Sequence, residues 1–205
     1  MQKTIVYVVD DSDLILDLVR KILENSGEIE GSYYQSGIEL LNQLRPGVVD
    51  CVVADLKMPD VDGEELFQRI RQCDPLVSIV IMTGFADVKT AVRLMEQGTF
   101  TLLEKPFTQE ELIAAVKRAT NHTCELRKNN ASLTKATAMK QLLTAEEAEV
   151  LECIVSGLTN KEIANTLTLS PRTLDRRRQS ILRKLNVNTV AEAVALIART
   201  AAISR

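Results

Sequence analysis

Three aspartates follow short apolar runs in the first half of the chain. Asp10 and Asp11 come directly after the run Thr4–Val9, and Asp55 comes directly after the run Cys51–Ala54. Carboxylates packed together repel one another, so a hard divalent cation with oxygen ligands is their natural partner, and Mg²⁺ suits a site with few carboxylates. We therefore predict a site for Mg²⁺, or for Mn²⁺ in its place.

The elements that must position these residues alternate between strand-like and helix-like patterns. The expected strands are Thr4–Val9, Ser32–Tyr34, Cys51–Ala54, Ser78–Met82 and Phe100–Leu103. Such alternation predicts an α/β fold, with a parallel sheet covered by helices on both faces. Ligands in these folds bind at the carboxyl ends of the strands. Thr83 and Lys105, which follow the fourth and fifth segments, are therefore expected at the same edge as the aspartates.

The order of these residues resembles the signature of a two-component receiver domain. The signature consists of Asp10-Asp11, Asp55-Leu-Lys-Met-Pro59 with Gly63, Thr83-Gly84 and Lys105-Pro-Phe107, and it covers about residues 1–122. The resemblance implies a five-stranded, parallel, doubly wound (flavodoxin-like) fold. It also implies that Asp55 accepts a phosphoryl group from a sensor histidine kinase.

The same resemblance implies roles for the other members of the signature. Mg²⁺ would be held by Asp11, Asp55 and the Lys57 backbone carbonyl, with Asp10 assisting through water. The phosphoryl group would be contacted by Thr83 and Lys105, and the peptide bond before Pro106 would be cis. These roles agree with the chemistry, because a carboxylate can take a phosphoryl group as an acyl phosphate while nearby cations offset its charge. The new dianion would shift a two-state equilibrium rather than cause turnover.

One position departs from the receiver pattern. Three residues before Lys105, where receivers usually carry Tyr or Phe, this chain has Leu102. Phe100 lies two residues earlier along the same expected strand and should share the face of Leu102. The coupling of an aromatic side chain to Thr83 is therefore not implied here. The face expected to move on phosphorylation is 87–121.

Composition limits the remaining function classes. A chain of 205 residues, with 45% hydrophobic and 26% charged residues, has room for two ordinary globular domains. No CxxC pair occurs among the four cysteines, which are Cys51, Cys73, Cys124 and Cys153. The single histidine is His122, which we expect at the surface. A disulfide framework and a structural zinc site are therefore excluded. No apolar window of about 18 residues is present, so we expect a cytoplasmic protein without membrane contact.

Charge divides the chain into two parts. Residues 1–120 hold 12 basic and 20 acidic side chains, whereas residues 121–205 hold 13 and 8, so their net charges are −8 and +5. The basic part is expected to act near a polyanion such as nucleic acid. Between the two, residues 123–142 are rich in Thr, Asn, Lys and Ser, and we interpret them as a linker that could be helical.

Residues 143–205 carry helix starts and no strand pattern. Thr144-Ala-Glu-Glu147, Thr159-Asn-Lys-Glu162 and Thr189-Val-Ala-Glu192 are capping boxes, and Ser170 precedes Pro171. These signals predict an all-α domain of four helices. The short second helix, the turn at Thr168-Leu-Ser170 and the longer helix begun at Pro171 have helix-turn-helix spacing.

In the longer helix, one apolar stripe turns a polar stripe outward. The apolar residues are Leu174, Ile181 and Leu185, and the outward residues are Arg172, Asp175, Arg176 and Gln179. Arginine can pair with guanine, glutamine with adenine and aspartate with cytosine in the major groove. Residues expected to contact phosphates are Lys161, Thr173, Arg178 and Lys184.

Residues 140–202 resemble the LuxR/NarL-type output domain, with Leu143-Thr-Ala-Glu-Glu147 ahead of this helix and Arg183-Lys-Leu-Asn-Val187 behind it. The whole chain is thus similar to a NarL/FixJ-class response regulator. This resemblance implies binding to double-stranded promoter DNA as a homodimer formed on phosphorylation, commonly through the final helix, here Thr189–Thr200. Arg177 stands where relatives usually have histidine, and could pack or bind phosphate.

Two other functions compete with this interpretation. The first is a Mg²⁺-dependent phosphohydrolase, although the position two residues after Asp55 is Lys57, which leaves no acid to protonate a leaving group. The second is an interaction module whose basic part docks onto RNA polymerase or RNA. Turnover of a phosphate ester would favour the first, and DNA retention without discrete sites would favour the second.

Overall fold

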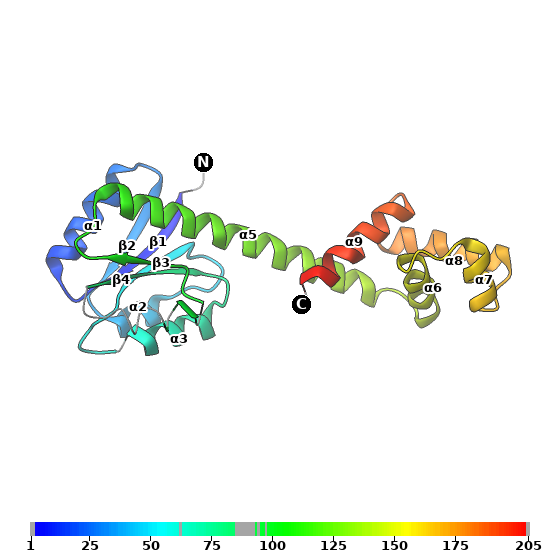
Figure 1. Ribbon diagram of the computed structural model, residues 1–205, viewed down its shortest axis with the longest axis horizontal. Helices are drawn as coiled ribbons and strands as arrows, with labels where there is room; N and C mark the ends of the chain where they lie inside the picture. Colours follow the sequence, from blue (N-terminus) through cyan, green and yellow to red (C-terminus); the bar gives the residue numbers. More distant parts are fainter. Residues whose placement is uncertain (1–2, 62, 85–92, 94, 97, 204–205) are drawn as a thin grey trace. The chain divides into compact units, whose positions relative to one another are not determined.

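The computed structural model describes the chain except for residues 1–2, 62, 85–92, 94, 97 and 204–205 (Figure 1). The chain forms two compact units, Met1–Arg127 and Lys128–Arg205. Part of the face expected to move, residues 87–92, 94 and 97, lies outside the described residues.

A five-stranded parallel sheet forms the centre of the first unit. Its strands are β1 (Thr4–Val9), β2 (Ile29–Tyr34), β3 (Cys51–Asp55), β4 (Ser78–Thr83) and β5 (Thr101–Glu104), in the order β2-β1-β3-β4-β5. All residues of β3 and β4 are buried, as expected of central strands covered on both faces. The predicted doubly wound sheet is confirmed.

Helices cover both faces of the sheet (Figure 1). They are α1 (Asp13–Asn25), α2 (Gly37–Gln43), α3 (Gly63–Cys73) and the long α5 (Gln109–Gln141). One apolar cluster joins α1 and α5 to Val6, Val8 and Val53, and a second joins α2 and α3 to Val9 and Val52. Because successive strand residues point to opposite faces, β1 and β3 contribute to both clusters.

Phe100 does not share the face of Leu102. The strand β5 begins at Thr101, one residue later than predicted, so Phe100 precedes the regular alternation. Leu102 packs against the cluster of α2 and α3, whereas Phe100 packs against the cluster of α1 and α5 and its ring lies 5.0 Å from that of His122. The expectation of a shared face is therefore wrong, and Phe100 is not placed to replace an aromatic residue at position 102.

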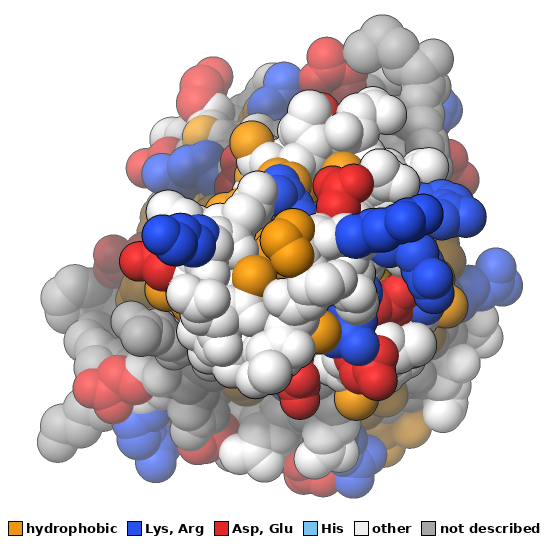
Figure 2. Space-filling model, turned by 90° about the vertical axis from the view of Figure 1, so that its right-hand side faces the viewer, with side chains coloured by type: hydrophobic (Ala, Val, Ile, Leu, Met, Phe, Trp, Pro, Cys, Tyr) orange, Lys and Arg blue, Asp and Glu red, His pale blue; other side chains and the backbone are white. Residues whose placement is uncertain are grey.

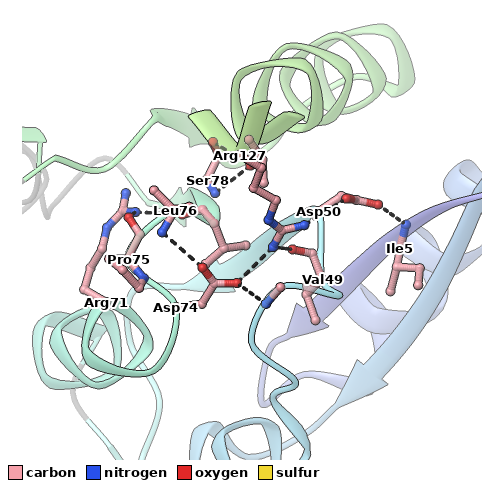
Figure 3. A network of polar contacts seen from close by, with 12 residues as sticks. Ile5, Val49, Asp50, Arg71, Asp74, Pro75, Leu76, Ser78 and Arg127 are labelled. Carbon is pink, nitrogen blue, oxygen red and sulfur yellow. Dashed lines mark hydrogen bonds and ion pairs between the residues drawn. The ribbon is translucent and has the colours of Figure 1, made fainter. Parts of the chain in front are cut away.

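The amino-terminal edge of the sheet is joined to α5 by a polar network (Figure 3). Arg127 donates to the carboxylates of Asp50 at 3.3 Å and Asp74 at 2.9 Å, and to the Val49 carbonyl at 2.7 Å. One turn earlier, the buried Thr123 hydroxyl accepts from the Ser78 N–H at 2.9 Å. The first compact unit thus extends to Arg127, beyond the expected receiver end at residue 122.

In the described part of the second unit, helices joined by short connections are the only regular elements. After the end of α5 it contains α6 (Ala145–Val155), α7 (Asn160–Thr166), α8 (Pro171–Lys184) and α9 (Val190–Ile203). The Thr144 and Thr159 capping boxes are present, and Ser170 caps α8 with Pro171 at its first turn, as predicted. Its core contains Val150, Leu151, Ile163, Leu174, Ile181, Leu185, Ala193 and Ile197.

The turn between α7 and α8 is short. Thr168 adopts a left-handed backbone conformation with φ of 52°, and the Leu169 N–H bonds back to the Ala164 carbonyl at 2.8 Å. This turn sets α8 against α7 in a helix-turn-helix arrangement. In the part of the chain that the structure describes, no helix combines the length and apolar character needed to cross a membrane.

Candidate phosphoryl site and nucleic-acid interface

Two buried carboxylates and one ammonium group meet at the carboxyl edge of the sheet. Asp55 is the last residue of β3, Asp10 follows β1, and both are buried, with 7% and 1% of their surface exposed. Lys105, which follows β5, places its Nζ 2.6 Å from Asp10 Oδ2 and 2.5 Å from Asp55 Oδ1. The structure thus places Asp10, Asp55 and Lys105 together at this edge.

The charges of this cluster depend on one another. Burial raises the pKa of Asp10, and the hydrogen bonds from Lys105 and from the Ser12 N–H offset only part of this effect. Burial also opposes ionisation of Lys105, but its bonds to Asp10 and Asp55 outweigh burial and raise the Lys105 pKa. The ammonium group is therefore held charged between the two carboxylates, where it can meet an incoming anionic group.

Backbone geometry fixes the Asp55 carboxylate. The Lys57 N–H donates to Asp55 Oδ2 at 2.9 Å, which leaves Oδ1 toward Lys105. A Cβ atom at Gly63 would lie 2.5 Å from the Leu56 carbonyl oxygen, so only glycine allows α3 to begin this close to the loop after β3. The signature glycine therefore supports the position of Asp55.

Thr83 and Asp11 lie at the edge without joining the cluster. Thr83 ends β4, is buried, and donates its hydroxyl to the Gly84 carbonyl at 3.1 Å. Asp11 is exposed. Among the described residues, no group of three or more Asp, Glu, His or Cys side chains is arranged to hold a metal ion. The structure thus brings Asp10, Asp55 and Lys105 together, but not Asp11. The peptide bond before Pro106 is cis, as the resemblance implied.

In the second unit, α8 presents the predicted polar stripe to solvent. Arg172, Thr173, Asp175, Arg176 and Gln179 are all exposed, while Leu174, Ile181 and Leu185 are buried in the core. Figure 2 faces this end of the molecule, where Lys and Arg side chains gather on one side of the surface. Lys161 of α7 lines the same hollow as Asp175 and Arg178. A basic, exposed helix face of this kind is suited to a DNA groove.

Three basic residues of α8 also contact neighbouring helices. Arg177 Nη2 lies 2.5 Å from Glu146 Oε2 of α6, and Lys184 Nζ lies 2.6 Å from Glu147 Oε2. Arg178 donates to the Asn160 side chain of α7. The sequence left open whether Arg177 packs or binds phosphate, and it gave no role to Glu146 or Glu147 beyond the helix cap.

Comparison with known proteins identifies both units. Residues 6–117 match the response regulator receiver domain, and residues 141–197 match the LuxR family of bacterial regulatory proteins. The transcriptional regulatory protein FixJ of Azorhizobium caulinodans is 33% identical over 189 residues, which is 92% of this chain and 89% of that protein. This chain belongs to the NarL/FixJ class of two-component response regulators.

Other members of this class agree along the whole length. FixJ of Bradyrhizobium diazoefficiens is 33% identical over 95% of this chain and 94% of its own. The solved structure of response regulator StyR matches with a TM-score of 0.83 at 30% identity, covering 97% of this chain and 100% of that one. This response regulator is therefore a transcriptional regulator with a receiver domain and a LuxR-type DNA-binding domain.

Proposed function

We propose that Asp55 is the phosphoryl acceptor through which a sensor histidine kinase switches this response regulator. The observation that carries the proposal is the placement of the Asp55 carboxylate at the carboxyl edge of the sheet, 2.5 Å from the Lys105 ammonium. Asp55 would attack the phosphorus atom, form an acyl phosphate and release the kinase histidine. Lys105 would then bond to a phosphoryl oxygen, and the Thr83 hydroxyl would leave the Gly84 carbonyl to donate to another.

A divalent cation fits the donors at this edge. Mg²⁺ and Mn²⁺ prefer hard oxygen ligands. Such ligands are offered here by the carboxylates of Asp10, Asp11 and Asp55 and by the backbone carbonyl of Lys57. Asp11 is exposed and can turn toward the edge, whereas Asp10 already accepts a hydrogen bond from the Ser12 N–H at 3.0 Å. When bound, the cation would offset negative charge on the phosphoryl oxygens.

On the DNA side, we assign base contacts and phosphate contacts to different residues. Arg172, Asp175, Arg176 and Gln179 are proposed to contact bases, and Lys161, Thr173 and Arg178 are proposed to contact phosphates. The exposure of this stripe on α8 supports the assignment. The protein would bind promoter double-stranded DNA in the cytoplasm as a homodimer formed on phosphorylation, and RNA polymerase is a candidate further partner.

Two linked experiments test the proposal. Wild type, Asp55→Asn and the surface control Asp17→Asn are treated with acetyl phosphate and Mg²⁺, and intact-mass spectrometry counts the phosphoryl groups gained. One group on wild type and on Asp17→Asn, with none on Asp55→Asn, supports Asp55 as acceptor, and equal labelling of all three contradicts it. Rapid turnover of p-nitrophenyl phosphate, lost in Asp55→Asn, would favour a phosphohydrolase instead.

A protection assay on genomic DNA fragments tests the second unit. Discrete, roughly palindromic protected sites support sequence-specific binding by a dimer. Retention of DNA without discrete sites would contradict it and favour docking onto RNA polymerase or RNA.

A further inference from the structure

The first turn of α6 holds one face of α8 through a set of polar contacts that the DNA-binding function does not use. Glu147 is buried, yet its carboxylate accepts from the Thr144 N–H at 2.8 Å, the Ser180 hydroxyl at 2.7 Å and Lys184 Nζ at 2.6 Å. Beside it, Glu146 bonds to Arg177 at 2.5 Å. Two adjacent glutamates of α6 thus contact three polar residues of α8.

The contacted residues lie on a different face of α8 from the proposed base contacts. At 3.6 residues per turn, Arg177, Ser180 and Lys184 fall within about 60° of one another around the helix axis. Arg172, Asp175, Arg176 and Gln179 fall within about 100° of one another, centred about 120° away from the first group. Lys184 therefore lies outside the base-contact stripe of α8, and its Nζ is bonded to Glu147 of α6.

Lys184 is also the main cation available to a buried anion. Burial opposes ionisation of Glu147, but the bonds from Lys184, Thr144 and Ser180 outweigh it and lower the Glu147 pKa to about 2. The Glu147 side chain is only 9% exposed, and that of Lys184 is 33% exposed. If Lys184 left to bind a DNA phosphate, the ionised carboxylate would remain buried with neutral donors only, which is unfavourable.

We infer that Lys184 is a positioning residue, which orients the recognition helix α8 by binding Glu147, and that it makes no phosphate contact. Arg177 acts in the same way through Glu146. This inference rests on the proposed function in one respect, the assignment of α8 as the helix that faces DNA. It replaces the expectation that Lys184 is one of the phosphate contacts.

The test compares the salt dependence of DNA affinity in the full-length protein. Variants are Lys184→Met, Glu147→Gln, the double variant, and Lys161→Met as a positive control for a phosphate contact. Loss of one phosphate contact lowers the slope of log K against log salt by about 0.9 per subunit. A positioning residue leaves this slope unchanged while weakening affinity.

The inference predicts that Lys184→Met and Glu147→Gln each weaken DNA binding by about tenfold, with the wild-type salt slope, and that the double variant is no weaker than either single one. Arg177→Gln should behave like Lys184→Met but with a smaller effect, because Glu146 is exposed. The inference would be overturned if Lys184→Met lowered the salt slope as much as Lys161→Met does and Glu147→Gln left DNA affinity unchanged.

Amide hydrogen exchange of the same proteins without DNA separates this inference from the proposed function. Peptides covering 171–184 should exchange faster in Lys184→Met and Glu147→Gln, and at wild-type rate in Lys161→Met, because only the first two break the contact with α6. Unchanged exchange in all variants would refute the positioning role. Failure of wild type to bind any DNA at low salt would refute the proposed function while leaving the exchange result to decide the contact between α6 and α8.

Discussion

Replacing Arg127 by Met should destabilise the first unit strongly, although this residue lies in a segment that looks like a linker. The change removes the bonds to Asp50, Asp74 and the Val49 carbonyl. Breaking a buried ion pair by removing one partner costs about 3–5 kcal/mol. Asp74, whose side chain is 5% exposed, keeps the N–H donors of Gly47 and Leu76, and Asp50 is one-third exposed. We therefore expect a loss of about 2–3 kcal/mol in unfolding free energy.

Tyrosine fluorescence during urea unfolding can measure this effect in the full-length protein. The chain has no Trp, and its three Tyr residues, Tyr7, Tyr33 and Tyr34, all belong to the first unit. The signal therefore reports that unit alone. With a urea dependence of about 2 kcal/mol per molar, the midpoint should fall by about 1–1.5 M.

Lys128→Met is the matched control, because it removes a basic side chain at the next position, which is exposed. Its effect should remain within about 0.5 kcal/mol, the usual range for a surface substitution. Equal midpoints for Arg127→Met and Lys128→Met would refute the argument that the Arg127 network joins α5 to the sheet.

Three further predictions concern other parts of the protein. Arg176→Ala should cost about 1–3 kcal/mol of DNA affinity and relax the preference at one base position, whereas equal weakening on every permuted site would indicate a phosphate contact. Gly63→Ala should destabilise the first unit by about 1–3 kcal/mol, because its methyl group would meet the Leu56 carbonyl; a wild-type urea midpoint would contradict this. Burial opposes ionisation of Asp74, but bonds from Gly47, Leu76 and Arg127 outweigh it and lower its pKa below the usual value. Asp74 therefore stabilises the fold above its unfolded pKa of about 3.9. This contribution to the unfolding free energy should be lost as pH falls below that value and should not change between pH 8 and 6. The same loss of unfolding free energy at acid pH in Asp74→Asn would argue against this role.

Local patterns predicted the elements that place the phosphoryl site. Strands end next to Asp10, Asp55 and Lys105, and parallel pairing brings those ends to one edge of the sheet. The three residues could therefore be grouped from the sequence. The helix starts of the second unit were predictable for a similar reason. A capping box such as that of Thr144 and Glu147 is a contact within one helical turn and leaves a short sequence signature.

Contacts between distant segments leave no such signature. Arg127 is 53 residues from Asp74 and 77 from Asp50, so nothing in the spacing around Arg127 distinguishes it from a solvated linker residue. Lys184 and Glu147 are 37 residues apart. The helical period correctly placed the core stripe of α8, but it could not show that an acidic side chain of α6 faces Lys184.

A one-residue difference in a strand boundary explains the error at Phe100. Side chains alternate between the faces of a sheet, so the prediction of its face depended on β5 beginning at residue 100. The strand begins at Thr101, and Phe100 lies on the side of α1 and α5. Boundaries of short strands depend on the neighbouring strand, here the pairing of Val80 with Thr101, which the sequence of β5 alone does not contain.

The central claim is that a phosphoryl group on Asp55 changes the DNA affinity of this response regulator. The most direct measurement is the affinity of full-length wild type and Asp55→Asn for a protected promoter fragment, with and without acetyl phosphate and Mg²⁺, together with sedimentation of the same samples. The account predicts that the phosphodonor raises affinity and dimer content in wild type only. Full phosphorylation of wild type with no change in either quantity would contradict it.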